Sequence, residues 1–209
     1  MTNKYYHNAY GGLHGEDIPT PVGRAAFVYL DKPNTKFAPA KYGLTILFDK
    51  KDKKAIEQLR AIQAMCTEMA TELFKGKVPK NFEQPIFRDG DGESSKYEGF
   101  PGNWYIVAKN DKRSGFTILD DVLPEAIEAG MLVRAQVQPY VDPKGFSYKL
   151  RGLRLVKDDG VRFKVAPDGT ALIKGLDEAV AAVSVSGSTS LDAAFENAPE
   201  EAGNGLDIL

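Results

Sequence analysis

The sequence predicts a mainly β fold that carries one long helix, an α+β arrangement. Three observations predict it. Apolar and polar residues alternate over Lys41 to Asp49, as in a strand with one buried face. Apolar residues recur every three or four positions from Ile56 to Leu73, which indicates an amphipathic helix. Two strand-like runs flank residues 142–145, Asp-Pro-Lys-Gly, a strong hairpin-turn signal.

The chain begins with a segment that we expect to be an irregular arm. Residues 1–20 place several tyrosines and both histidines among Gly, Asn and Pro. Gly23 to Leu30 then reads as a strand, which residues 31–34, Asp-Lys-Pro-Asn, bring to an end. The second strand is Lys41 to Asp49, and its alternation places on one face Tyr42, Leu44, Ile46 and Phe48.

A long helix is predicted after the second strand. Asp52 is a plausible N-cap, the helix is expected to run to about Lys75, and Gly76 is its stop signal. Its apolar residues form one stripe that should be buried: Ile56, Leu59, Ile62, Met65, Cys66, Met69 and Leu73. Because Cys66 lies on this stripe, we interpret it as a packed core thiol and not as a nucleophile.

A long connection and several short elements follow the helix. Residues 77–102 are rich in Pro, Gly and charge, and long connections of this kind are often functional or mobile. Trp104 to Lys109 reads as a strand, and residues 116–119 as a short one. Leu123 to Ala129 is expected to be a helical turn that Gly130 ends.

The hairpin of Met131–Val141 and Phe146–Val156 is the clearest local prediction. Pairing Val141 with Phe146 sets a register with one core face and one polar, cationic face. The core-face pairs are Ala135 with Gly152, Val137 with Leu150, and Pro139 with Tyr148. The other face pairs Gln136 with Arg151, Gln138 with Lys149, and Tyr140 with Ser147, while Arg134 meets Leu153. A last hairpin is expected over residues 161–165 and 170–174.

Charge divides the chain into a body and a tail. We expect an arm at residues 1–20, one domain at 21–175 and a mostly disordered tail at 176–209. Residues 1–175 carry all 27 Lys and Arg against 22 Asp and Glu, whereas the tail carries seven acidic residues and no Lys or Arg. The tail ends in three large aliphatic residues and an acid, which suit an apolar pocket ringed by cations on a partner protein: Leu206, Asp207, Ile208 and Leu209. The alternative is a frayed terminus whose apolar end arises by chance and binds no partner.

Several function classes find little support. The single cysteine excludes an internal disulfide and fits a reducing cytoplasm, and we find neither a signal-peptide pattern nor an apolar stretch of the roughly 20 residues that span a bilayer. Both histidines, His7 and His14, lie in the arm without a cysteine nearby. Residues 89–93 begin like a calcium loop, but Ser94 stands where glycine is required. We therefore predict no catalytic residue, no metal site and no cofactor.

What the body does contain is aromatic residues interleaved with cations. Single-stranded nucleic acid needs cations along its phosphates and flat side chains under its bases. The predicted cations are Arg24, Lys41, Lys109, Lys112, Arg113, Arg134, Lys149 and Arg151, and the predicted stacking rings are Phe27, Tyr29, Tyr105 and Tyr140. Core packing is an equal alternative for Phe27, Tyr29 and Tyr105, and the favoured one for Tyr42 and Trp104. The hairpin cations could equally form an ordinary solvated face.

Three segments of the chain resemble tailed-phage single-stranded DNA-binding proteins: residues 23–34, 37–50 and 131–156. The order strand, strand, long helix, strands is similar too. The resemblance implies an OB-fold barrel, a five-stranded Greek key, with an added helix. It implies protection of single-stranded DNA during phage replication and recombination in the cytoplasm of the infected bacterium. It also implies a tail that contacts replication or recombination proteins, and makes a homodimer plausible.

The tail tip departs from the bacterial pattern, a run of Asp that ends in Pro-Phe, because this chain has one Asp in its tip and ends in Ile-Leu. A rival interpretation is a structural or scaffolding phage protein that does not bind nucleic acid. A gel shift on oligo-dT against duplex would separate the two. A nucleic-acid-processing enzyme would require a carboxylate cluster on one face, which spacing does not support.

Overall fold

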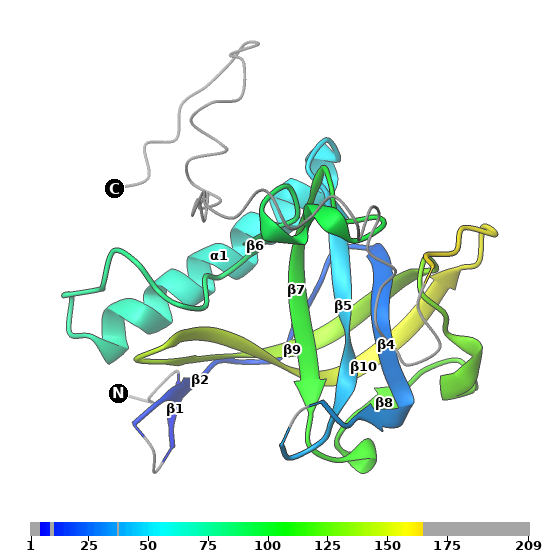
Figure 1. The fold of residues 1–209 in the computed structure, drawn as a ribbon. Coiled ribbons are helices and arrows are strands. Elements are labelled where there is room, and N and C mark those ends of the chain that lie inside the picture. Colours follow the sequence, from blue (N-terminus) through cyan, green and yellow to red (C-terminus); the bar gives the residue numbers. More distant parts are fainter. Residues whose placement is uncertain (1–4, 9–10, 37, 165–209) are drawn as a thin grey trace.

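Five long strands close into a barrel in the computed structural model, which describes residues 5–8, 11–36 and 38–164 (Figure 1). They are β4 (Gly23–Asn34), β5 (Lys41–Asp49), β7 (Asn103–Asn110), β9 (Leu132–Asp142) and β10 (Gly145–Lys157). The order is β4-β5-β7-β10-β9, and β9 pairs with β4 to close the ring. Only the β7–β10 pair among these five contacts is parallel. This is the five-stranded Greek-key barrel of the OB fold, as predicted.

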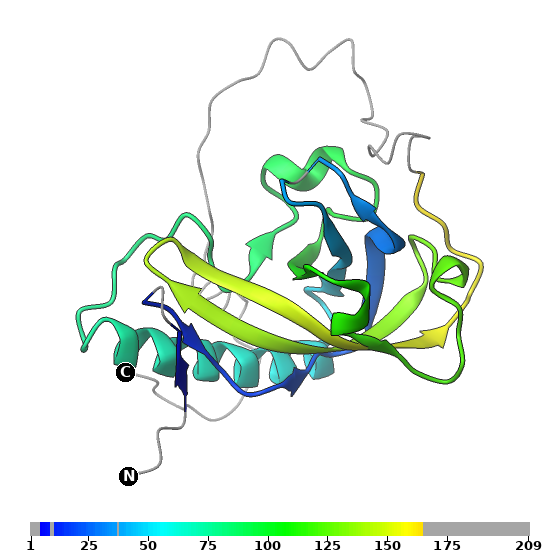
Figure 2. The same ribbon diagram turned by 90° about the horizontal axis from the view of Figure 1, so that it is seen from below.

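One helix, α1 (Lys53–Leu73), links β5 to β7 and lies beside the β9–β10 hairpin (Figures 1 and 2). The Asp52 side chain caps it by accepting hydrogen bonds from the backbone N–H groups of Lys54 and Ala55, at 3.0 and 3.2 Å. At the other end Gly76 adopts a φ of +80° and donates its N–H to the Thr71 carbonyl. Both ends therefore match the residue types that predicted them.

The apolar stripe of α1 covers one side of the barrel core. Leu59, Ile62, Cys66 and Met69 are fully buried there, together with Trp104 and Phe48 from the strands. The Cys66 thiol lies 3.9 Å from the Tyr148 hydroxyl, and burial raises the pKa of this thiol to about 12. The prediction of a packed core thiol is confirmed, since Cys66 is fully buried among the apolar residues of the core.

The β9–β10 hairpin follows the predicted register up to Leu150 and departs from it beyond. Val141 pairs with Phe146 and Val137 with Leu150, as expected. A bulge at Arg151 then shifts the pairing by one residue. The predicted pairs Gln136–Arg151, Ala135–Gly152 and Arg134–Leu153 are therefore wrong. The pairs found are Gln136–Gly152, Ala135–Leu153 and Arg134–Arg154.

The arm that we expected to be irregular contains three two-residue strands. They are β1 (Tyr6–His7), β2 (Leu13–His14) and β3 (Ile18–Pro19). β2 and β3 pair with β9, and β1 pairs with β2. The described parts of the arm are thereby fixed beside β9, and Tyr5 and Leu13 are buried in the core.

The remaining connections are short pieces. Within residues 77–102 lie β6 (Arg88–Asp89) and the 3₁₀ helix η1 (Glu93–Lys96). After β7 come η2 (Arg113–Gly115), β8 (Thr117–Ile118) and η3 (Pro124–Ala126), so the predicted short strand and helical turn are present but shorter. Val161 to Lys164 form no strand, which contradicts that part of the last predicted hairpin. Its remainder and the tail lie outside the described residues. None of the described helices is long and apolar enough to cross a membrane.

Candidate nucleic-acid interface

The outer face of β5 and β7 is the part of the barrel where predicted rings and cations meet. In the β5–β7 pair, Gly43 lies opposite Lys109, Thr45 opposite Val107, and Leu47 opposite Tyr105. Because side chains alternate along a strand, these residues share the outer face, and their neighbours Ile46 and Ile106 point into the core. The face between strands two and three of an OB barrel is where such folds bind oligonucleotides, and β5 and β7 hold those positions here.

A hollow of about 530 Å³ opens on this face, and we call it the aromatic hollow. Phe27, Tyr29 and Tyr97 line it and are half-exposed, whereas Phe100 and Tyr105 are buried at its base. The Phe27 ring lies 5.2 Å from the Tyr97 ring, edge to face, and the Phe100 and Tyr105 rings lie 5.0 Å apart. The other residues that line it are Asn34, Lys41, Tyr42, Gly43, Leu44, Thr45, Arg88, Ser94, Val107 and Lys109.

Phe27 reaches this hollow through an irregularity in its strand. The β4–β5 register shifts between Ala26 and Tyr29, and Phe27 has a φ of +48° in the left-handed region. A bulky residue rarely adopts that conformation, and such strained positions cluster at ligand sites. The bulge thus turns the Phe27 ring toward Tyr97. Tyr105, by contrast, is 8% exposed and its hydroxyl bonds the Ser94 hydroxyl at 2.7 Å, so it forms the floor of the hollow.

A second hollow, of about 370 Å³, lies between β7, the β9–β10 hairpin and residues 84–88, and we call it the hairpin hollow. Tyr140 and Lys149 line it from the hairpin, and His14 from the arm. The Tyr140 hydroxyl accepts a hydrogen bond from the Asn8 amide at 3.2 Å, and the Tyr140 ring lies 4.7 Å from the His14 ring. Its other lining residues include Gln84, Pro85, Ile86, Ile106, Asn110, Asp111, Phe146, Ser147 and Tyr148.

His14 is the polar group of the hairpin hollow that the protein leaves unsatisfied. Its Nδ1 atom is buried and has no hydrogen-bond partner in the part of the chain that the structure describes. Burial, and secondarily the charge of Lys149, lowers the pKa of this imidazole. Burial therefore favours the neutral form of the ring.

Three cations form the ridge between the two hollows: Lys41, Arg88 and Lys109 line both. Burial lowers the pKa of the Lys109 ammonium, and the charges of Arg88 and Lys41 lower it further. Like charges that raise each other's energy in this way create a positive potential that a bound anion would relieve. Lys41 also forms an ion pair with Asp111, whose side chain is 66% exposed. An exposed pair of that kind is weak, so an incoming phosphate could displace it.

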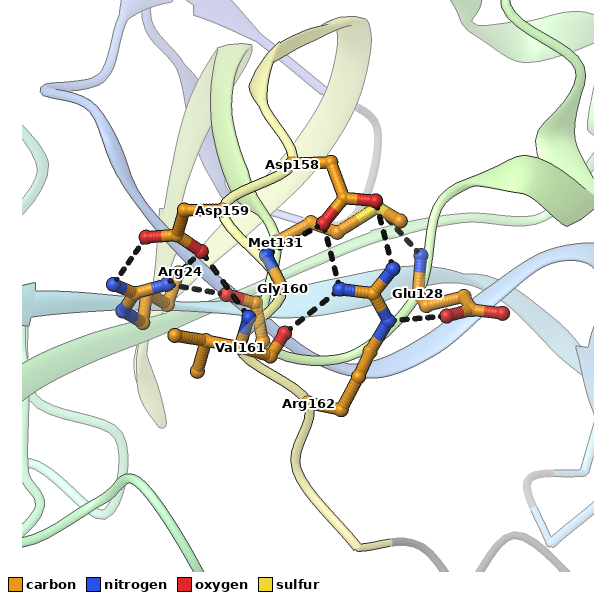
Figure 3. Close-up of polar contacts among 9 residues, drawn as sticks. Arg24, Glu128, Met131, Asp158, Asp159, Gly160, Val161 and Arg162 are labelled. Carbon is orange, nitrogen blue, oxygen red and sulfur yellow. Dashed lines mark hydrogen bonds and ion pairs between the residues drawn. The ribbon is translucent and has the colours of Figure 1, made fainter.

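Five of the predicted DNA-binding residues lie outside both hollows. Arg24 donates two hydrogen bonds to the Asp159 carboxylate, at 3.1 and 2.8 Å, and one to the Gly130 carbonyl (Figure 3). Arg134 donates to the Thr20 carbonyl at 3.0 Å, and Arg151 lies 3.3 Å from Asp17. The other two are Lys112, which is exposed, and Arg113, whose guanidinium lies 4.8 Å from the centre of the Phe116 ring.

The seven other predicted residues line one hollow or both: Phe27, Tyr29, Lys41, Tyr105, Lys109, Tyr140 and Lys149. Arg88, Tyr97 and Phe100 were missed by sequence reasoning. They lie in the long connection, where no strand alternation assigns a face, and their one signal was that long charged connections are often functional. The tail-tip residues Leu206, Asp207, Ile208 and Leu209 lie outside the described residues.

Comparisons with known proteins bear on the family and the fold of the chain. Residues 19–161 match the family model described as Enterobacter phage Enc34, ssDNA-binding protein. The single-stranded DNA-binding protein of bacteriophage Enc34, solved in complex with ssDNA, is 20% identical with a TM-score of 0.55, covering 76% of this chain and 93% of that one. A C-terminal truncation of it is 21% identical with a TM-score of 0.55, covering 74% and 94%. Bacteriophage T7 gp2.5, a single-stranded DNA-binding protein, is 15% identical with a TM-score of 0.44, covering 82% and 99%. No curated protein gives a match.

Proposed function

Because the chain belongs to the phage family named after the ssDNA-binding protein of Enterobacter phage Enc34, we propose that it binds single-stranded DNA across the two hollows. The observation that carries this proposal is the ridge of Lys41, Arg88 and Lys109 with a hollow on either side. Phosphates lie on the ridge, since its three cations lie close together and the exposed Lys41–Asp111 pair can open to an incoming phosphate. Bases enter the hollows on both sides.

Base contacts in the aromatic hollow come from the half-exposed rings of Phe27, Tyr29 and Tyr97. Stacking on such rings is worth about 1–3 kcal/mol per base and tolerates any sequence, because every base has a π-face. The hairpin hollow takes the next stretch of the strand beside Tyr140 and Lys149. This arrangement binds single-stranded DNA without strong sequence preference, and it requires no catalytic group.

The biological setting is part of the same proposal. We infer protection of single-stranded DNA during phage replication and recombination, in the cytoplasm of the infected host. The acidic tail competes with DNA for the cations and recruits replication or recombination proteins through its aliphatic tip. A chain truncated after Ser186 loses five acidic side chains and should bind DNA more tightly at low salt. Unchanged affinity would sink the self-competition and leave partner recruitment to be tested by itself.

The binding proposal is tested by titrating a labelled oligo-dT and a duplex of equal length, at two salt concentrations, by fluorescence anisotropy. We expect preference for oligo-dT and weaker binding at high salt. Arg88→Ala should weaken binding several-fold and make the salt dependence shallower, by about 0.7 in the log–log slope for each lost phosphate contact. Arg134→Ala, outside both hollows, is the matched control. Equal binding of the duplex, or equal losses in both variants, would contradict this interface.

A further inference from the structure

The chain does not leave the barrel at the end of β10 but crosses its surface as a strap, residues 158–164 (Figure 3). Two arginines bind its first two residues. Arg24 donates to both carboxylate oxygens of Asp159, and Arg162 to both of Asp158 at 2.7 and 2.8 Å. Arg162 also pairs with Glu128, which ties the strap to the segment before β9. Bidentate arginine–carboxylate pairs fix orientation as well as position.

The strap backbone also lies directly on that segment. A Cβ atom added at Gly130 would lie 2.4 Å from the Val161 carbonyl oxygen, so only glycine permits this approach. The N–H of Phe163 donates to the Ala129 carbonyl at 3.1 Å. At the next residue, the Lys164 N–H donates to the Glu98 carboxylate at 2.8 Å. The strap therefore ends against the loop that carries Tyr97 and Phe100.

Phe163 makes the apolar contact at this end. A Cβ atom added at Gly99 would lie 2.4 Å from the Phe163 ring, so the ring packs directly on the loop backbone. Phe163 is half-buried against the outer apolar cluster, which consists of Ala26, Leu47, Phe100 and Tyr105 and against which Phe27 and Tyr97 also pack. It does not line the aromatic hollow itself. It packs against the cluster that contains Phe100 and Tyr105, two rings that do line the hollow.

We infer that Phe163 is a positioning residue for DNA binding: it holds the 94–100 loop so that the Tyr97 ring stands beside Phe27. This inference rests on the proposed function. The loop has one short 3₁₀ helix of its own, and such a segment depends on outside contacts for its conformation. Phe163 supplies an apolar contact and Lys164 a hydrogen bond from the strap. Losing the ring would leave Tyr97 without its support, although no DNA contact is removed.

The first test is Phe163→Ala in the full chain, with affinity for oligo-dT as the readout. We expect the Kd to rise roughly tenfold, the effect of misplacing one stacking ring. Val161→Ala is the matched control on the same strap, since its side chain is 36% exposed and outside the cluster. It should change the Kd less than about twofold. Phe163→Tyr keeps the ring and should restore binding. If Phe163→Ala unfolds, Phe163→Leu takes its place.

A double-mutant cycle with Tyr97→Ala separates positioning from a direct contact. If Phe163 acts through Tyr97, the double variant binds as weakly as Tyr97→Ala alone. Multiplied losses would mean that Phe163 contacts DNA itself and would overturn the inference. Hydrogen exchange in residues 94–100 should also rise in Phe163→Ala without DNA, while the rest of the barrel is unchanged. Wild-type protein that fails to bind oligo-dT would refute the proposed function. Wild-type binding with an unaffected Phe163→Ala would refute this inference alone.

Discussion

Two groups of cations differ in what surrounds them. Arg24 and Arg162 are bound by Asp158, Asp159 and Glu128. Lys41, Arg88 and Lys109 lie between the two hollows, where burial and the charges of Arg88 and Lys41 lower the pKa of Lys109. Carboxylates bind both cations of the first group closely, whereas the second group brings three cations together beside open hollows, with the exposed Lys41–Asp111 pair among them.

The comparison indicates that the groups around a cation decide whether it can bind a phosphate. The body's formal net charge is only +5, which would not by itself make a strong polyanion binder. The Asp159 carboxylate binds Arg24, which holds residues 158–164 in place and keeps that arginine from phosphate binding. The positive charge of the ridge, by contrast, is concentrated in one place and flanked by aromatic rings. We expect this local arrangement to decide affinity.

The largest effect is expected at the rings beside the ridge. Tyr97→Ala should raise the Kd for oligo-dT roughly tenfold or more, because a stacked base is worth about 1–3 kcal/mol. Tyr97→Phe keeps the ring and should bind like the wild type. Anisotropy titrations of the three proteins measure this. A Tyr97→Ala variant with wild-type affinity would remove the aromatic hollow from the DNA path.

The next largest effect is expected at the ridge, and it is measured as DNA affinity and as Tm. Lys109→Met should weaken DNA binding several-fold and reduce the salt dependence. Its Tm should change little, because methionine keeps the apolar stem of the side chain. Lys53→Met, on the exposed face of α1, is the control for loss of one charge. A Lys109→Met variant that lost stability and kept its affinity would reverse our assignment.

Acid should break the ion pairs that Arg24 and Arg162 form with Asp159 and Asp158. Hydrogen bonds from Arg162 and Arg24 lower the pKa of Asp158 and of Asp159, respectively, from 3.8 to about 2. Depressed carboxyl pKa values mean that these pairs stabilise the strap above pH 4, and that this contribution is lost as the pH falls from about 4 to about 2. NMR titration of the two carboxyl carbons would check the midpoints. Midpoints near 3.8 would show that the pairs do not form.

The smallest effect is expected for cations that pair with protein groups outside the two hollows. Arg151→Ala should change the Kd for oligo-dT less than about twofold, because Arg151 pairs with Asp17 and lines neither hollow. The same titration measures it beside Lys149→Ala, two positions away on β10 and within the hairpin hollow. Equal losses in the two variants would extend the interface over the whole hairpin.

The sequence predicted the elements well because their signals are local. The Asp52 cap, the α1 stripe and the hairpin turn each depend on residues within a few positions of one another. The predicted register is wrong beyond Leu150, because a bulge at Arg151 interrupts the alternation. The sequence of a single strand does not indicate where such a bulge occurs. The Phe27 bulge was hidden for the same reason, although Phe27 itself was predicted as an outward ring.

Part of the predicted interface lines the two hollows, and the cations that lie apart from them do so for one reason. Arg24, Arg134 and Arg151 were chosen as surface cations, but their partners Asp159, Thr20 and Asp17 are more than 100 residues away in the chain. A local sequence pattern shows where charged residues lie along the chain, but it does not show partners so far away in the sequence. Arg88 and Tyr97 were missed because they lie in a connection without periodicity, where only tertiary structure decides which way a side chain faces.

The position of β9 at the junction of the sheet has a consequence for how the chain folds. β9 pairs with β2, β3, β4 and β10, and α1 packs against it, so the arm, the helix and the closing edge of β4 reach their final partners only once residues 132–142 are present. During synthesis the apolar stripe of α1 emerges well before the strand that covers it. Barrel closure also joins Gly23 to Val133, a pairing of high contact order that slows folding. We expect the nascent chain to fold in one late step, and fragments that end before β9 to aggregate.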